Sequence, residues 1–84
     1  MHPREFAERI LTLRLRFAFS VTSWGRTLAH NQAVGGQPNS RHLTWRGVDV
    51  LLDDPGQREE FFKCAVELGL KALDERDHIH IQTP

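Results

Sequence analysis

The stretch RGVDVLL, residues 46–52, decides the fold because it alternates apolar and polar side chains as a half-buried β-strand does. Side chains point alternately to the two faces of a strand, so three of its apolar residues share one face and Asp49 lies on the other. The stretch HIHIQ, residues 78–82, divides in the same way, with its histidines opposite its isoleucines. Each strand therefore offers an apolar face to a helix layer and a face that carries potential metal ligands. The apolar residues concerned are Val48, Val50, Leu52, Ile79 and Ile81.

Upstream of this strand, the spacing of apolar residues changes from a helical to an extended period. A helix is predicted from Pro3 to about Leu13, with the proline suited to the first turn. From Leu13 to Thr22 every second residue is apolar, which predicts a strand with one buried face. The change from helix to strand is expected between Leu13 and Arg16. The alternating residues are Leu13, Leu15, Phe17, Phe19 and Val21.

The remaining elements follow from turn and capping residues. Thr27 to Ala33 is predicted to form a short helix, and the turn-forming stretch VGGQPNS, residues 34–40, an irregular loop. Asp54 is predicted to cap a further helix, with Pro55 at its first position and Gly69 at its end. Two short strands, joined by a tight polar turn at Arg76 and Asp77, are expected at Ala72–Glu75 and His78–Gln82.

Together these elements predict a single α+β domain covering residues 1–84. The economical arrangement is a small antiparallel sheet with helices packed on one face and a polar site on the other. The predicted strand at residues 46–52 and the last strand both supply side chains to that polar face.

Composition narrows the possible functions. A chain of 84 residues has a small core, and its single cysteine, Cys64, cannot close an internal disulfide, so a bound metal or a partner chain is a plausible reinforcement. The formal net charge of zero argues against a nucleic-acid partner. No apolar run is long enough to span a membrane, and the charged start lacks the features of a secretory signal, so the chain is expected to be cytoplasmic when made.

The polar residues of these segments suit a zinc site. Catalytic zinc commonly takes three ligands from His, Asp and Glu, a set that His42, Asp49 and His80 would supply. Zinc lowers the pKa of a bound water to about 7 and polarises a carbonyl, which suits amide hydrolysis. Asp77, three residues before His80, is the predicted general base. Arg26, which follows the first strand, is predicted to hold a substrate carboxylate or an oxyanion.

The order of Ser40, His42 and Asp49, followed far along the chain by Asp77-His78-Ile79-His80, resembles a family of zinc peptidases. These are the D-alanyl-D-alanine carboxypeptidases and L-alanyl-D-glutamate endopeptidases that cut bacterial cell-wall peptides, and the sonic hedgehog signalling domain shares their fold. The family pattern is S-x-H-x-x-G-x-A-x-D, and the branch that ends in D-H-x-H is the closer match. The likeness extends from about Val21 to Gln82 and includes an arginine-bearing strand end and the loop "N-x-A-V-G-G".

Carried over residue by residue, the resemblance implies that zinc is held by His42, Asp49 and His80. It implies that Asp77 is the base, that His78 hydrogen-bonds a ligand or the transition state, and that Arg26 contacts substrate. Asn31 and Ser40 are expected to brace the loop through hydrogen bonds to its backbone. Cys64 is expected to be a small core residue rather than a ligand.

The sequence also departs from the family pattern. Trp45 stands where the family usually has glycine, and Gly47 stands where it usually has alanine. Asp77 is shorter than the glutamate of most members. Trp24 and Trp45 could each be core residues or pack against a substrate.

The expected function is a zinc metallopeptidase that hydrolyses a peptide bond in the peptidoglycan stem peptide, as a D,D-carboxypeptidase or an L-Ala-D-Glu endopeptidase. By analogy, it would be a phage or prophage lysis enzyme, or part of a phage particle, that reaches the cell wall after release. Two alternatives stay open: a catalytically silent zinc-binding module that binds cell wall or a protein partner, and a structural domain in which the histidines are incidental. The sequence leaves the oligomeric state open.

Overall fold

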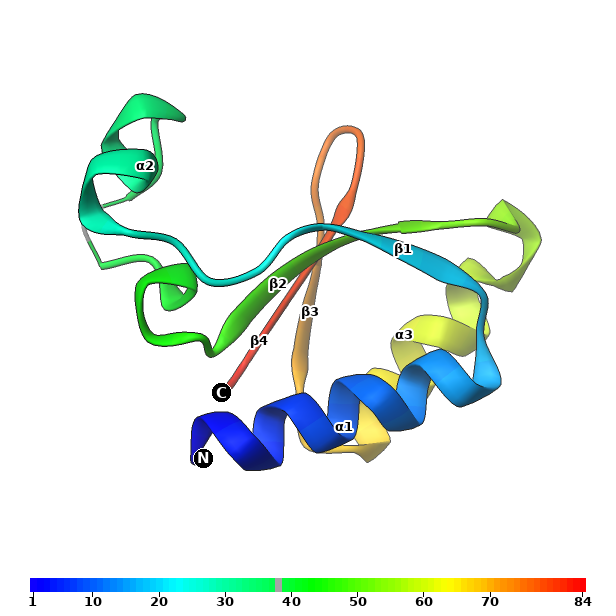
Figure 1. Cartoon of the computed structure of the whole chain (residues 1–84). Coiled ribbons are helices and arrows are strands. Elements are labelled where there is room, and N and C mark those ends of the chain that lie inside the picture. The colour runs from blue at the N-terminus through cyan, green and yellow to red at the C-terminus, as the bar shows by residue number, and fades with distance from the viewer. Residues whose placement is uncertain (38) are drawn as a thin grey trace.

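An antiparallel sheet organises the fold, as the sequence predicts (Figure 1). The computed structural model describes residues 1–37 and 39–84. Within them the four strands lie in the order β1-β2-β4-β3, so β2 and β4 form the centre of the sheet. The strands are β1 (Phe19–Ser23), β2 (Gly47–Leu52), β3 (Lys71–Asp74) and β4 (Ile79–Gln82).

Helices α1 (Pro3–Arg16) and α3 (Arg58–Glu67) cover one face of the sheet (Figure 1). Helix α2 (Leu28–Ala33) lies away from both and contacts the 3₁₀ helix η1 (Arg41–Thr44). A second 3₁₀ helix, η2 (Pro55–Gln57), leads into α3. The expected α+β class is therefore confirmed, with the two longer helices on the face opposite the polar side chains.

The hydrophobic core lies between this helix layer and the sheet. Phe6, Ile10 and Leu13 recur at helical spacing on α1, and all three are buried. From α3, the ring of Phe61 packs edge-on against the ring of Phe19, with 5.7 Å between the ring centroids. The sheet contributes the same apolar residues that its sequence alternation placed on one face, and four of them are buried: Val48, Val50, Ile79 and Ile81.

Cys64 also lies in this core, where it is a buried free cysteine. A guanidinium nitrogen of Arg16 donates to its sulfur at 3.0 Å. The expectation that Cys64 is a small core residue is confirmed.

The predicted strand that begins at Leu13 is wrong over its first part. Helix α1 continues to Arg16, and β1 begins only at Phe19. Leu13 completes the buried helical stripe, whereas Leu15 is 88% exposed, so their apparent alternation is a coincidence of helical geometry. The expected buried face of β1 is also incomplete, because this strand lies at an edge of the sheet and Val21 is 46% exposed.

The capping prediction at Asp54 needs a smaller correction. Its side chain accepts a hydrogen bond from the Gly56 backbone at 2.9 Å, but this cap begins η2 rather than α3. The helix ends as predicted, because Gly69 has a φ of 74°, a left-handed conformation that suits glycine just after a helix. The turn between β3 and β4 is also present, closed by a hydrogen bond from the Glu75 backbone to the carbonyl oxygen of His78 at 3.0 Å.

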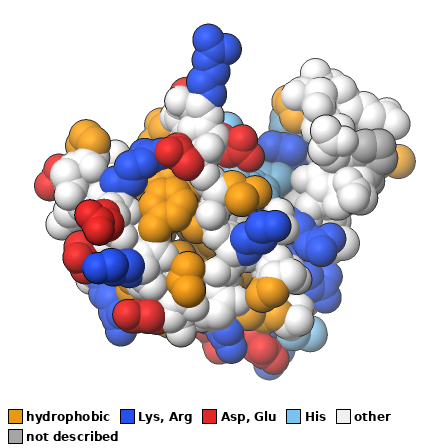
Figure 2. Space-filling view, turned by 180° about the vertical axis from the view of Figure 1, so that it is seen from behind, with side chains coloured by type: hydrophobic (Ala, Val, Ile, Leu, Met, Phe, Trp, Pro, Cys, Tyr) orange, Lys and Arg blue, Asp and Glu red, His pale blue; other side chains and the backbone are white. Residues whose placement is uncertain are grey.

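The outer surface mixes side chains of opposite charge. On the face shown in Figure 2, Lys and Arg are interspersed with Asp and Glu around separate apolar side chains. Among the described residues, no helix has both the length and the apolar character needed to cross a membrane.

Candidate metal centre

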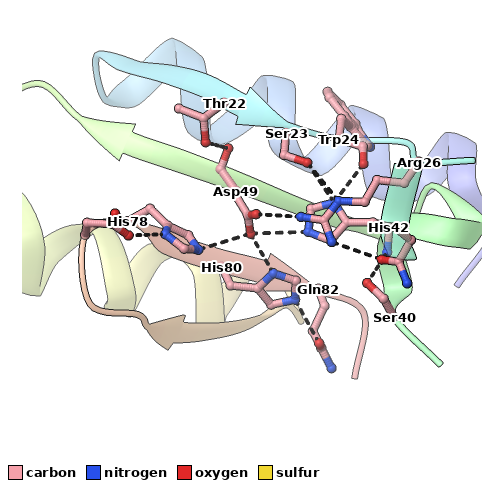
Figure 3. Close-up of polar contacts among 12 residues, drawn as sticks. Thr22, Ser23, Trp24, Arg26, Ser40, His42, Asp49, His78, His80 and Gln82 are labelled. Carbon is pink, nitrogen blue, oxygen red and sulfur yellow. Dashed lines mark hydrogen bonds and ion pairs between the residues drawn. The ribbon is translucent and has the colours of Figure 1, made fainter. Parts of the chain in front are cut away.

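Three side chains from separate parts of the chain meet on the sheet face that the helices leave open (Figure 3). His42 comes from η1, Asp49 from β2 and His80 from β4, and one potential ligand atom of each lies within 4.8 Å of the others. The Asp49 Oδ1 atom is 3.3 Å from His42 Nε2 and 2.8 Å from His80 Nδ1. His42 and Asp49 are buried, and His80 is half-buried.

The pairing of the central strands places two of these side chains together. Asp49 and His80 are direct partners in the register between β2 and β4, so they project from the same face of the sheet. His42 is the second residue of η1, and its backbone N–H donates to the side chain of Ser40, the residue that caps this helix, at 3.2 Å. Ser40 thus fixes the turn that carries a potential ligand.

The hydrogen bonds of the two histidines determine which ring nitrogens face Asp49. His42 Nδ1 donates to the backbone carbonyl oxygen of Trp24 at 2.7 Å, because a carbonyl can only accept, and this leaves Nε2 with a lone pair. His80 Nε2 donates to the Gln82 side-chain oxygen at 3.0 Å, so Nδ1 faces Asp49. Such outward hydrogen bonds are typical of metal-binding histidines.

This arrangement fits a divalent metal. Two ring nitrogens and one carboxylate oxygen point toward one another, and their lone pairs repel unless a proton or a cation lies between them. Ligand atoms on a tetrahedral zinc ion lie about 3.3 Å apart, given zinc–ligand bonds of about 2.0–2.1 Å. The separation of 3.3 Å between His42 Nε2 and Asp49 Oδ1 matches that spacing, whereas the 2.8 Å between His80 Nδ1 and Asp49 Oδ1 is the shorter distance of a hydrogen bond.

Arg26 holds the second oxygen of Asp49. Its Nη2 donates to Asp49 Oδ2 at 3.3 Å, its Nε donates to Ser23 Oγ at 3.3 Å and its Nη1 donates to Asn31 Oδ1 at 3.1 Å. Arg26 was expected to contact substrate; in this structure its three guanidinium nitrogens donate to protein oxygens. This ion pair leaves Oδ1 as the Asp49 atom that faces the histidines.

Asn31 connects Arg26 to the loop that follows α2. This side chain is 1% exposed, and its Nδ2 donates to the backbone carbonyl oxygen of Gln37 at 2.8 Å. The Gly36 backbone N–H donates to the Asn31 carbonyl oxygen at 2.7 Å. The backbone hydrogen bonds expected of Asn31 are therefore present, and they tie the loop to the ion pair beside the potential ligands.

His78 lies at the other side of the cluster (Figure 3), and Asp77 forms a pair with it. His78 Nδ1 donates to Asp77 Oδ1 at 2.7 Å, and His78 Nε2 lies 3.6 Å from Asp49 Oδ1. Because one ring nitrogen of His78 contacts Asp77 and the other faces Asp49, His78 stands between Asp77 and the cluster, and the Asp77 side chain is 87% exposed. The hydrogen bond from His78 lowers the pKa of the Asp77 carboxyl.

The cluster opens into a groove of about 520 Å³. One wall comes from η1 and the loop before it, and includes Gln37, Ser40 and Arg41. The opposite wall comes from the β3–β4 hairpin and includes Leu73 and Glu75. Such a concave site beside three ligand-type side chains can hold an extended peptide next to a metal.

Comparison with known proteins agrees with this geometry. The family model described as peptidase M15 matches residues 9–82, which is most of the chain. The chain belongs to the peptidase M15 family. No curated protein and no solved structure matched it. M15 peptidases are metal-dependent, and the cluster of His42, Asp49 and His80 could bind a metal.

The two departures from the family pattern have structural consequences in this M15 chain. Trp45, at the usual glycine position, has a φ of 59° and ends η1 in a left-handed conformation that is uncommon for tryptophan. Its ring is 58% exposed and covers Gly25, whose missing side chain leaves room for it. Gly47 allows β2 to approach η1, because a Cβ atom there would lie 2.9 Å from Cβ of Arg41.

The two tryptophans also differ in their surroundings. Trp24 packs against the core, with its ring edge-on to Phe6 at a centroid distance of 6.1 Å. Trp45 does not line the groove among the described residues. Trp24 is not among the residues that line the groove either.

Asp49 and the two histidines shift one another's charge equilibria, as the pKa values of Asp49 and His80 show. Burial raises the pKa of the Asp49 carboxyl, but the hydrogen bonds and positive charge of His42 and His80 outweigh it and hold that pKa well below its usual range. The hydrogen bond to Asp49 raises the pKa of His80 in turn, against the opposite effect of burial. A proton on His80 thus occupies the place where a metal would bind, and the two would compete.

Sequence reasoning missed several groups that support the cluster. Gln82 received no role, although its position two residues after His80 places the two side chains on the same side of β4. Ser23 carried no signal in the sequence. The Trp24 carbonyl could not be found from side-chain patterns at all, because any residue type would supply it.

Proposed function

We propose that the chain is a zinc-dependent peptidase that hydrolyses a peptide bond in the stem peptide of peptidoglycan. The observation that carries the proposal is the convergence of His42, Asp49 and His80 with the ring protons of both histidines directed outward. A set of two histidines and one carboxylate is typical of catalytic zinc, which keeps a further coordination position for water or substrate. The groove beside the cluster supports a peptide substrate.

Each residue of the site has a role in this proposal. His42, Asp49 and His80 would hold zinc, and Arg26 orients Asp49 through its second oxygen. Bound zinc supplies a Lewis acid that polarises the scissile carbonyl and makes water a better nucleophile at neutral pH. Asp77 and His78 would act together in proton transfer.

The Asp77–His78 pair suits proton transfer because the two ring nitrogens of His78 have different neighbours. The His78 Nε2 atom faces the cluster, while Asp77 accepts from Nδ1 and stabilises positive charge on the ring. Nε2 would take a proton from the attacking water and give it to the leaving amine. Replacing Asp77 by Asn would lower activity and shift its pH profile, whereas a purely structural role would leave the profile unchanged.

The finer assignments rest on the resemblance described above. We propose that the chain cleaves peptidoglycan either as a D,D-carboxypeptidase or as an L-Ala-D-Glu endopeptidase. We also propose that it is a phage or prophage lysis enzyme, which acts on the wall after release or as part of a phage particle. The D-H-x-H ending and the "N-x-A-V-G-G" loop support this placement within the family.

The test begins with elemental analysis of the purified protein for stoichiometric zinc. Purified peptidoglycan is then digested with the wild type and with His80→Ala, and mass spectrometry identifies the fragments. His30→Ala is the matched control, because His30 is exposed and lies outside the groove. We expect products from the wild type and the control but not from His80→Ala, and equal product release by His80→Ala would refute the assignment.

One observation favours a second candidate. The exposed Asp77 carboxylate contacts His78 rather than the cluster, which would suit a catalytically silent zinc-binding module that binds cell wall or a protein. Stoichiometric zinc without release of any peptidoglycan fragment would support this alternative.

A further inference from the structure

Two arginines line the groove, and the structure uses them differently. Arg26 is 13% exposed, and each of its three guanidinium nitrogens donates to a protein oxygen. Arg41 is exposed at the η1 wall, and among residues 1–37 and 39–84 no hydrogen bond or ion pair engages its guanidinium group. The positive charge that the groove offers to an incoming molecule is therefore on Arg41.

The backbone of Arg41 is held firmly although its side chain reaches solvent. Its carbonyl oxygen accepts a hydrogen bond from the Arg46 backbone at 2.9 Å and another from the Thr44 hydroxyl at 3.2 Å. The close approach of Gly47 places the start of β2 directly against its Cβ atom. Arg41 also immediately precedes His42, so its side chain leaves the backbone next to a potential metal ligand.

The opposite wall of the groove carries negative charge. Glu75 lines it at the β3–β4 hairpin, and its backbone is bonded to that of His78. A negatively charged group on a bound peptide would be repelled there and attracted to the η1 wall. The two walls of the groove therefore carry opposite charges, and the positively charged wall lies beside His42.

We propose that Arg41 is a specificity-determining residue that binds a free carboxylate of the peptide substrate beside the scissile bond. This inference rests on the proposed peptidase function and names the substrate class. A guanidinium group can bind a carboxylate through two parallel hydrogen bonds, which fixes orientation as well as charge. Arg26 does not share this task, because its nitrogens position Asp49 and the loop.

The test uses the zinc-loaded full chain and two matched peptides with the stem-peptide sequence. The peptides carry either a carboxylate or a carboxamide on the residue that follows the scissile bond. We expect wild-type kcat/KM to be about 10- to 100-fold higher for the carboxylate peptide, the range for a hydrogen bond to a charged group. Arg41→Gln is expected to abolish this preference by lowering kcat/KM for the carboxylate peptide only.

Two further variants control for charge and for folding. Arg46→Gln removes the same charge near η1, but Arg46 lies outside the groove and its guanidinium bonds to backbone carbonyls, so the preference is expected to persist. Arg41→Lys keeps the charge without the paired hydrogen bonds and is expected to retain a reduced preference. If Arg41→Gln does not fold, the substrate preference of Arg41→Lys tests the role of Arg41 instead.

The outcomes separate the inference from the function on which it rests. Wild-type hydrolysis of both peptides at equal rates, or an undiminished preference in Arg41→Gln, would overturn the role of Arg41 and leave the peptidase intact. A zinc-loaded wild type that hydrolyses neither peptide would overturn the proposed function, and the substrate preference with it.

Discussion

Replacing Gly36 by alanine should weaken metal binding without touching a ligand. A Cβ atom at this position would lie 2.1 Å from Asn31 Oδ1 and 3.0 Å from Arg26 Nη1. Because Asn31 is buried, its side chain has little space to retreat, and its hydrogen bond to Arg26 would break. A hydrogen bond to a charged group contributes about 1.5–3 kcal/mol, so the free energy of unfolding should fall by roughly that amount.

The expected loss of metal affinity follows from the contact between Arg26 and Asp49. Arg26 would lose one of three anchors and hold Asp49 less firmly. Loss of a group that supports a metal ligand typically lowers metal affinity about 10- to 100-fold. Competition with a chromophoric chelator would measure zinc affinity, and urea unfolding with excess EDTA would measure the stability of the metal-free chain.

The adjacent glycine provides the control. Gly35 has a φ of 71°, and a Cβ atom there would meet nothing within 4 Å. Gly35→Ala should therefore cost about 1 kcal/mol of backbone strain and leave zinc affinity unchanged. Equal losses of affinity in both variants, or an unchanged affinity in Gly36→Ala, would refute the proposed connection from loop to ligand.

Three further predictions concern the whole domain. Zinc at 100 times its dissociation constant should stabilise the fold by about 2.7 kcal/mol and raise the melting temperature by roughly 10–20 °C, and an unchanged melting curve with excess chelator would contradict this. In metal-free protein, the lowered pKa of Asp49 contributes stability that is lost as pH falls below about 4, and the raised pKa of His80 contributes stability that is present below about 6.5 and lost as pH rises further. Urea unfolding in chelator should therefore show a maximum between these values, and stability that increases steadily from pH 6 to 8 would exclude it. Because Trp45 has a φ of 59°, Trp45→Gly should be about 1 kcal/mol more stable than Trp45→Ala, the reverse of the usual order, in thermal or urea unfolding.

The centre of the sheet could be predicted from sequence because two independent signals coincide there. Alternation in residues 46–52 and 78–82 separates the apolar face from Asp49 and His80, and pairing of the strands then brings these two together. The α1–β1 boundary could not be predicted in the same way. Leu13 satisfies both a helical and an alternating pattern, and only its packing beneath the sheet decides between them.

The details of the site depend on contacts that no pattern encodes. Arg26 was correctly placed near the end of the first strand, but the sequence does not reveal that Asn31 and Asp49 are both within reach of its guanidinium. Asp77 lies in the turn, as expected from its surroundings, yet the orientation of its carboxylate toward His78 is set by the turn geometry. Such side-chain choices depend on three-dimensional neighbours rather than on spacing along the chain.

Because β2 and β4 are neighbours in the sheet, the chain that connects them, residues 53–78, supplies none of the three potential ligands His42, Asp49 and His80. Lengthening a surface connection costs little, about 0.6 kcal/mol of closure entropy for each doubling of its length. Insertions at the exposed residues Asp53 and Asp54 would leave the pairing of the central strands intact. A further domain could therefore be inserted at Asp53 or Asp54 without changing the positions of the three potential metal ligands.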